Sequence, residues 1–250
     1  MADSKVTGLG ENTTPAVTDL LHMIDDPSGT AAGQKMTIAS LLTLAVTNVT
    51  IQVLTGSSTY TPTTGMKKVL VICQAGGGSG ASVTGVDSYG GGGGGGGCAI
   101  KLLTAADIGA SKTYVAGAAS GVNADGNDST FGTTLVVAGK GLKGTASADS
   151  TTLGTLGVGG AGGIGTTGDL LIAGTAGMPG IVYSTSLGVG GAGGSSFLGG
   201  GAISVATETA GVAGGAYGGG GSGGASSAGT DRAGGAGAAG VIYCIEFLQV

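Results

Sequence analysis

Short apolar runs alternate with glycine tracts from residue 66 to the C-terminus. The region opens on residues 67–73 (KKVLVIC) and closes on residues 241–247 (VIYCIEF). Alternate positions of the closing run share one face of a strand, and these are Val241, Tyr243, Ile245 and Phe247. The runs between these two are residues 99–103, 112–115, 133–137, 170–172 and 203–205. Short strands joined by glycine-rich turns predict an all-β sandwich or roll.

A shorter pattern occupies the N-terminal region. Residues 19–24 (DLLHMI) are an apolar run that ends in Asp25-Asp26-Pro27-Ser28-Gly29, a sequence that favours a turn. Residues 34–38 read as a return strand and residues 39–42 as a short helical turn. A hairpin of this size cannot bury a core by itself, so we expect it to depend on a partner surface.

These patterns divide the chain into three parts. Residues 1–45 form the N-terminal module, and residues 46–65 form a connector strand rich in Val, Thr and Ile. Residues 66–250 form one glycine-rich β domain. Within it, residues 156–163 (LGVGGAGG) recur as residues 187–194, and residues 129–132 (STFG) have a looser echo in residues 195–199. We interpret the echoes as structural repetition.

The composition demands an unusual kind of packing. The first 65 residues hold six of the 60 glycines, and the remaining 185 hold 54. Each glycine in a regular element costs about 0.5–1 kcal/mol relative to alanine, so another term must offset the loss of entropy. Close backbone packing, as in collagen, or burial against further copies would supply it, but collagen's strict third-residue glycine is missing. We therefore expect an obligate homo-oligomer, a homotrimer in particular.

The charges argue against several function classes. Nine Lys and Arg are scattered along a chain of net charge −5, so no basic patch is available to bind nucleic acid. Residues 170–207 carry no charge, but Gly, Ser, Thr and Pro interrupt them, so we expect no membrane insertion. No secretory signal pattern is present at the N-terminus. Three widely spaced cysteines, Cys73, Cys98 and Cys244, are expected to be reduced and buried.

The glycine tracts produce false motifs. Patterns of the G-x-G-x-x-G type at Gly157 and Gly188 lack the following helix of a dinucleotide site. Residues 220–224 fit G-x-S-x-G, but the only histidine is the distant His22, so Ser222 is expected to be a turn residue. Residues 123–128 (NADGND) lack the terminal Glu of an EF-hand and are expected to be a polar turn. We expect no catalytic residues, no metal site and no cofactor.

Two segments resemble a known class of protein. Residues 1–42, with Lys5-Val6-Thr7-Gly8-Leu9, Thr13-Thr14-Pro15 and the 19–29 run, resemble the N-terminal attachment segment of phage tail-fibre and virion-appendage proteins. Residues 66–250 resemble the glycine-rich domain at the receptor-facing end of such fibres. The composition is also similar to that of the long-tail-fibre adhesins of T-even-like phages, whose glycine-rich motifs pack as polyglycine II layers. The expected fold is an N-terminal β-hairpin plus a glycine-rich β-sandwich or roll with polyglycine II segments.

The resemblance implies a structural virion protein, assembled in the host cytoplasm, that attaches to a host surface glycan or outer-membrane protein. Residues 1–45 would dock on other virion proteins. The docking candidates are Leu20, Leu21, Met23, Ile24, Met36 and Ile38. The receptor-contact candidates are the loop aromatics Tyr89, Tyr183 and Tyr217, although a Tyr beside Gly can equally serve to cover exposed backbone. A head or neck decoration subunit without a receptor role is the alternative, and a glycan depolymerase ranks third.

Overall fold

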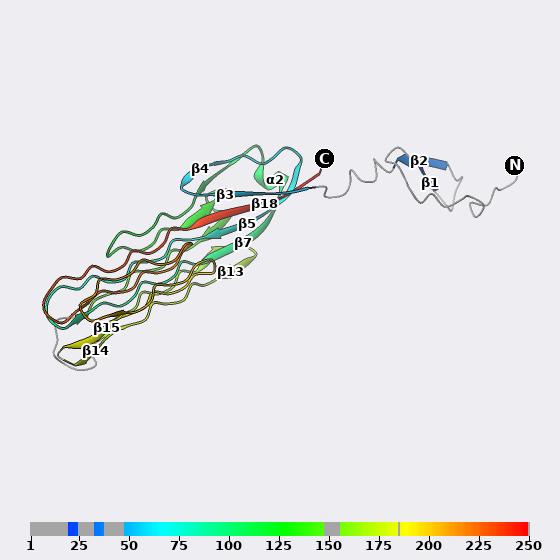
Figure 1. Ribbon diagram of the computed structural model, residues 1–250. Helices are drawn as coiled ribbons and strands as arrows, with labels where there is room; N and C mark the ends of the chain where they lie inside the picture. The colour runs from blue at the N-terminus through cyan, green and yellow to red at the C-terminus, as the bar shows by residue number, and fades with distance from the viewer. Residues whose placement is uncertain (1–19, 25–32, 38–47, 148–155, 185, 250) are drawn as a thin grey trace, which may run out of the picture.

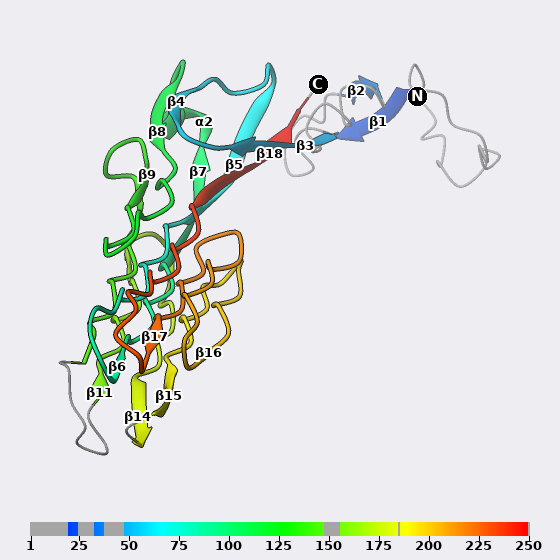
Figure 2. The same cartoon turned by 60° about the vertical axis from the view of Figure 1, so that its left-hand side comes forward.

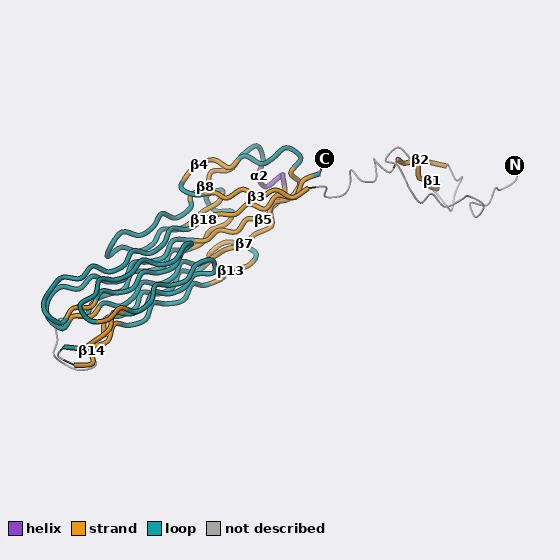
Figure 3. Tube along the Cα trace, viewed as in Figure 1, coloured by secondary structure: helices purple, strands orange, loops and turns teal. Residues whose placement is uncertain are grey.

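A computed structural model describes residues 20–24, 33–37, 48–147, 156–184 and 186–249. The described residues form antiparallel β-sheets and glycine-rich segments outside regular secondary structure (Figures 1 and 3). The prediction of an all-β fold is confirmed. The N-terminal hairpin pairs β1 (Leu20–Ile24) with β2 (Gly33–Thr37), with Leu20 opposite Thr37 and Ile24 opposite Gly33. The expected helical turn at residues 39–42 lies outside the described residues.

Two five-stranded sheets form a sandwich that we call the root. The first root sheet has the strand order β13 (Leu170–Ile172), β7 (Cys98–Thr104), β5 (Met66–Gln74), β18 (Val241–Leu248) and β3 (Asn48–Leu54). The second root sheet has the order β12 (Gly165–Thr167), β10 (Val136–Ala138), β9 (Ser129–Phe131), β8 (Lys112–Val115) and β4 (Ser57–Tyr60). A one-turn helix, α2 (Ala105–Ile108), follows β7 and begins with a capping box between Thr104 and Asp107.

The core of the root is made of side chains from the facing surfaces of both sheets. Val69, Val71 and Ile242 from the first sheet are fully buried. They belong to the same cluster as Phe131 and Tyr60 of the second sheet, whose rings lie 5.3 Å apart at a tilted angle. The apolar runs at 67–73, 99–103, 112–115, 170–172 and 241–247 all lie in strands of this sandwich.

The structure differs from the predicted bounds at three places. The connector at residues 46–65 belongs to the domain, because β3 pairs with β18 along seven residues and β4 pairs with β8. The run at residues 203–205 contributes only Val205 to a strand, β16 (Val205–Ala206), and the run at 133–137 only its last two residues. Residues 133–135 lie in a turn, and residues 203–204 lie outside regular secondary structure.

Beyond the root, the glycine tracts run side by side as extended rods (Figures 2 and 3). Residues 90–97 form the central rod. Its eight amides donate, in order, to the carbonyls of Gly224, Thr145, Met178, Gly221, Leu142, Thr175, Gly218 and Gly139, at 2.8–3.0 Å. Every third amide therefore reaches the same neighbouring segment. Three residues per turn is the repeat of the polyproline II helix, so the rod has the arrangement of polyglycine II.

Six rods surround the central rod, and each is hydrogen-bonded to the next. They are residues 75–81, 139–145, 158–164, 174–178, 191–195 and 218–224. Three of them accept from the central amides and the other three donate to its carbonyls, for example from Gly78, Gly160 and Gly194. Because neighbours lie on all sides, the residues of the 75–81, 90–97 and 218–224 rods are buried throughout. We call these three the inner rods.

The outer rods carry a period of three in burial. Along residues 138–147 the buried positions are Ala138, Gly141, Gly144 and Ser147, whereas the positions between them are more exposed. The repeat at residues 156–163 and 187–194 is structural: Gly160 and Gly163 donate to the central rod from one side, and Gly191 and Gly194 donate from another. The shorter echo, between residues 129–132 and 195–199, is not a structural repeat. Ser129–Phe131 is strand β9, whereas residues 195–199 contain a bend and no strand.

The far ends of the rods join through a small second β region that we call the tip (Figure 2). One sheet has the order β11 (Leu156–Gly157), β14 (Gly180–Ser184), β15 (Leu187–Gly190) and β16. A ribbon pairs β17 (Ala225–Ser226) with β6 (Ser88–Tyr89). The tip and the root thus lie at opposite ends of the glycine array.

Candidate functional site

The three candidate receptor-contact tyrosines do not lie together. Tyr183 is on strand β14 at the tip and is 53 % exposed. Tyr217 lies at the other end of the array, where residue 218 begins an inner rod beside Ala75 and Gln74. It lines a shallow groove of about 270 Å³ together with Val115, Asn127 and Gly240. A single surface containing both residues is therefore ruled out.

Tyr89 is a structural residue, and the prediction that it contacts a receptor is wrong. Its side chain is fully buried in the core of the tip with Val182, Val205 and Ala225. Burial raises the pKa of the Tyr89 phenol. The ring packs against Gly188, where an added Cβ would lie 2.5 Å from ring carbons. The interpretation that a Tyr beside Gly covers backbone thus holds for Tyr89.

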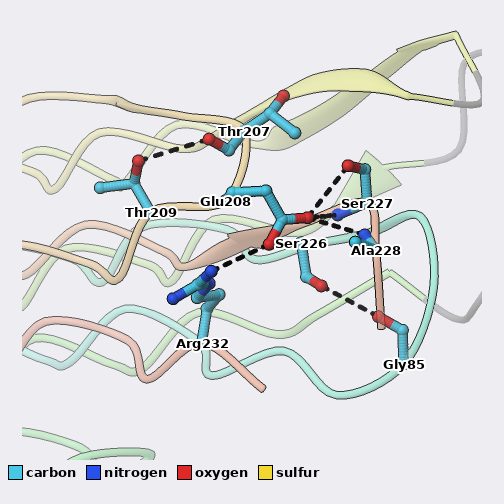
Figure 4. A network of polar contacts seen from close by, with 8 residues as sticks. All are labelled: Gly85, Thr207, Glu208, Thr209, Ser226, Ser227, Ala228 and Arg232. Carbon is cyan, nitrogen blue, oxygen red and sulfur yellow. Dashed lines mark hydrogen bonds and ion pairs between the residues drawn. The ribbon is translucent and has the colours of Figure 1, made fainter. Parts of the chain in front are cut away.

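Side chains tie the tip connections to one another, and Glu208 is at the centre of this network (Figure 4). Glu208 takes a left-handed backbone conformation, with φ of 61°. Its Oε1 accepts from the backbone amides of Ser227 and Ala228 at 2.6 and 2.7 Å and from the Ser227 hydroxyl at 3.0 Å. Its Oε2 accepts from Nη2 of Arg232, also at 3.0 Å. One carboxylate therefore holds both ends of the 225–232 connection.

This environment favours the charged form of Glu208. Hydrogen bonds from the Ser227 and Ala228 amides, followed by those from Arg232 and the Ser227 hydroxyl, lower the pKa of Glu208 to about 2. The carboxylate is thus ionised across the neutral and mildly acidic range. Because every hydrogen bond is directed at the carboxylate from within the chain, its role is to hold the loops in place.

Further hydrogen bonds extend the network to the other connections. The Thr207 hydroxyl donates to the Gly188 carbonyl at 2.8 Å and accepts from the Gly188 amide at 3.0 Å, which joins β15 to the loop before Glu208. Ser226 Oγ donates to the Gly85 carbonyl at 3.1 Å (Figure 4). The backbone amide of Tyr89 donates to Ser147 Oγ at 2.9 Å. The connections at 82–89, 180–188, 206–210 and 225–232 thereby form one cross-linked platform.

The platform presents apolar side chains to solvent. Val86, Tyr183 and Leu187 are each more than half exposed, and Val86 lies beside Gly229 of the neighbouring connection. The same connections also carry exposed polar side chains, such as that of Asp231. A rigid surface that combines an aromatic ring with hydroxyl, amide and carbonyl groups suits binding of a glycan or of a protein loop.

The virion-docking candidates are placed only in part. Leu20, Leu21, Met23 and Ile24 lie in β1, and Met36 lies in β2 opposite Leu21. Ile38 lies outside the described residues. Docking on another virion protein thus stays a prediction.

The other sequence features take structural roles. In the segment 123–128, Asp125 accepts a hydrogen bond from the Lys143 amide and forms an ion pair with Lys140 at 3.2 Å, and residues 124–127 bond to the 75–81 rod. Ser222 is not a turn residue, because it lies fully buried within an inner rod and its Oγ accepts from the Val212 amide. The described residues contain no cluster of three His, Cys, Asp or Glu side chains able to hold a metal ion.

Buried ionisable groups occur in the root. Glu246 is fully buried and accepts hydrogen bonds from Thr50 Oγ1, Gln52 Nε2, the Thr63 amide and the Tyr60 hydroxyl. Burial raises the pKa of Glu246, but these hydrogen bonds outweigh it and leave the pKa below its usual value. The three cysteines are free and buried as predicted, and burial raises the pKa of Cys98 to about 11 and that of Cys244 to about 12. Such thiols are poor nucleophiles.

A sequence signal for the Glu208 network did exist. Glu208 ends the charge-free stretch 170–207, and Arg232 is the chain's single arginine, placed beside a glycine tract. Isolated charges in nearly uncharged sequence favour a mutual ion pair. By contrast, the exposed Tyr183 and the buried Tyr89 both lie in short strands, so the presence of a strand does not distinguish them.

Within the described residues no helix has the length and apolar character needed to span a bilayer. The sequence matches no protein-family model, and no curated protein is significantly similar to it.

Proposed function

We propose that this chain is a structural phage fibre or appendage protein whose tip contacts the host-cell surface. The observation that carries the proposal is the separation of the two ends by a rigid rod array. Asn48, the first residue of β3, lies in the root, and the cross-linked loops lie at the far end of the rods (Figure 1). A module attached at its root would therefore present the tip outward.

The architecture of the tip supports recognition by preformed loops. Binding loses less conformational entropy when the contacting loops are already held in place. The Glu208 network and the Thr207 and Ser226 hydrogen bonds supply this constraint. The resemblance of residues 1–42 to virion-attachment segments supports the same reading from the sequence.

The test measures adsorption of the purified full-length protein to a panel of bacterial cells and to their isolated lipopolysaccharide and outer-membrane preparations. We expect binding to at least one strain, and we expect the double variant Tyr183→Ala, Leu187→Ala to weaken it by tenfold or more. Both side chains are more than half exposed, so the fold should not be affected. Phe197→Ala is the matched control, because Phe197 is 52 % exposed but follows the rod 191–195 at its root-facing end.

Equal loss of binding in the tip variant and in Phe197→Ala would contradict recognition at the tip. Failure of the wild-type protein to adsorb to any strain of a sensitive host would contradict the receptor role altogether. That second result would favour a decoration subunit of the head or neck.

A further inference from the structure

One face of the first root sheet is apolar and open to solvent. Pairing partners in an antiparallel sheet place their side chains on the same face, so the register defines its members. They form three rows across the sheet, made of Val49, Phe247, Lys68 and Thr104, then Ile51, Ile245, Leu70 and Leu102, then Val53, Tyr243, Ile72, Ile100 and Leu170. We call these thirteen residues the outer face.

The opposite side of the same strands behaves differently. There, Val69, Val71 and Ile242 are fully buried under the second root sheet. On the outer face, Ile51 is 62 % exposed and Val53 is 53 % exposed. No described element packs over these residues, and β3 is hydrogen-bonded to β18 alone.

The chemistry of the outer face resembles that of a protein interior. Eleven of its thirteen members are apolar. The single charged member is Lys68, which lies in the row farthest from the glycine array. A lysine at the border of an apolar surface can extend its ammonium group into solvent. An apolar surface is complementary to another copy of itself, and apart from Lys68 the outer face has no ionic group that would select a charged partner.

The outer face is about as large as the largest apolar patch of a typical monomer, a size that is often functional. Four long strands spaced by about 4.8 Å give a width of roughly 19 Å, and seven residues at about 3.3 Å give a length of roughly 23 Å, hence about 450 Å² in projection. The largest apolar patch of a typical monomer is about 300–600 Å² and marks an interaction site when it is continuous. In addition, β3 is an edge strand with neither a proline nor a charged residue to protect its free side.

We propose that the outer face packs against the same face of two further copies of this chain around a threefold axis parallel to the strands. Three sheets about 19 Å wide form a triangular prism whose walls lie roughly 5.5 Å from the axis. Packed sheets are about 10 Å apart, so their side chains meet about 5 Å from each sheet. Tyr243, Ile245 and Leu70 can thus fill the prism without a large void.

The threefold arrangement also accounts for the edge strand. Two sheets stacked face to face would leave the edge of β3 open, whereas in the prism each β3 lies beside the β7 side of the next copy. All three copies then point the same way, so their N-terminal segments enter at one end and their tips lie together at the other. The proposal concerns assembly and stands whether or not the tip binds a receptor.

The test is the mass of the full-length protein in solution, measured by sedimentation equilibrium over a dilution series. We expect three times the chain mass of 23.0 kDa. The double variant Ile51→Lys, Ile245→Lys places charges on two residues that are directly paired across β3 and β18. Its mass should fall threefold with an unchanged far-UV spectrum. Ile203→Lys is the matched control, because Ile203 is 74 % exposed on the glycine array, and this variant should remain a trimer.

A wild-type monomer or dimer at micromolar concentration would overturn the proposal, as would a trimer that persists in the double-lysine variant. If the double-lysine variant does not fold, Ile51→Thr, Ile245→Thr replaces it, because threonine is well tolerated in strands. That variant should raise the concentration of half-dissociation at least tenfold, and an unchanged value would equally contradict the outer face as the interface.

Discussion

In the root, side chains fill the space between two sheets, whereas in the glycine array the backbones themselves are in contact. Phe131, Val71 and Ile242 are typical of the first region, and their burial stabilises the root through the hydrophobic effect. Gly93 and Gly94 are typical of the second, where the interior consists of amides and carbonyls that bond to one another. The two regions meet where the 75–81 rod follows β5 and the 90–97 rod precedes β7, so the chain changes between side-chain packing and backbone packing at residues 74–75 and 97–98.

The difference predicts opposite tolerance to small substitutions. A side-chain core loses stability when atoms are removed, because a cavity remains. A polyglycine array loses stability when atoms are added, because a neighbouring backbone already occupies the space. The four predictions below test this contrast and then the polar groups that join each region, from the largest expected effect to the smallest.

The largest effect is expected for Gly93→Ala in the central rod. A Cβ at this position would lie 2.1 Å from the Gly78 carbonyl oxygen and 2.5 Å from that of Ser79, which no rotamer change relieves. We expect the glycine array not to form, which circular dichroism and limited proteolysis would reveal. Gly200→Ala is the control: nothing lies within 4 Å of its added Cβ, so its stability should stay within about 1 kcal/mol of wild type. Similar melting temperatures for Gly93→Ala and Gly200→Ala would contradict the account of the array as closely packed backbones.

Phe131→Ala tests the root. The side chain is fully buried against Tyr60, and its removal should lower the free energy of unfolding by about 3–5 kcal/mol. Urea denaturation followed by tyrosine fluorescence measures it. Phe197→Ala, which removes an aromatic ring that is half exposed, should cost less than about 1 kcal/mol. A loss below 1 kcal/mol for Phe131→Ala would mean that side-chain burial does not hold the root together.

Glu246→Gln tests the buried carboxylate. Losing the charge weakens its hydrogen bonds with Thr50, Gln52 and Tyr60, and we expect a loss of about 1.5–3 kcal/mol, as for one hydrogen bond to a charged group. Because the folded pKa of Glu246 is lowered, the wild-type stabilisation is complete above the unfolded glutamate pKa of about 4.3. It declines as the pH falls through the folded pKa. The difference in melting temperature between wild type and Glu246→Gln should therefore be smaller at pH 3 than at pH 7. An equal difference at both pH values would contradict this account.

Glu208→Gln should have the smallest effect on global stability, because the ion pair with Arg232 is partly exposed at the tip. The folded pKa of about 2 means that the contribution of Glu208 is present above pH 4.3 or so and is lost as the pH falls toward 2. We expect faster hydrogen exchange at the Ser227 and Ala228 amides and no change in the inner rods. Unaltered exchange at these amides would show that Glu208 does not hold the tip loops.

The strands of the root could be predicted because each carries its own signal. Residues 67–73 and 241–247 are apolar β-branched runs, and both form long strands close to the predicted bounds. The face that they bury was less evident, since the alternate residues of β18 that lie in the core include the charged Glu246. Ile242 and Cys244 lie in the core, whereas Tyr243, Ile245 and Phe247 lie on the outer face. Only the position of the second root sheet distinguishes the two sets.

Apolar periodicity and composition are local properties, so they were enough to predict the all-β class, most of the root strands, the buried cysteines and the need for close backbone packing. Long-range contacts determine which glycine tracts are inner rods, that Tyr89 is buried and Tyr183 exposed, and that residues 48–60 belong to the domain. A glycine has no side chain that could specify a partner, so one tract matches any other in sequence. Its neighbours follow only from the connections at both ends and from the hydrogen bonds that all seven rods of the hexagon form together.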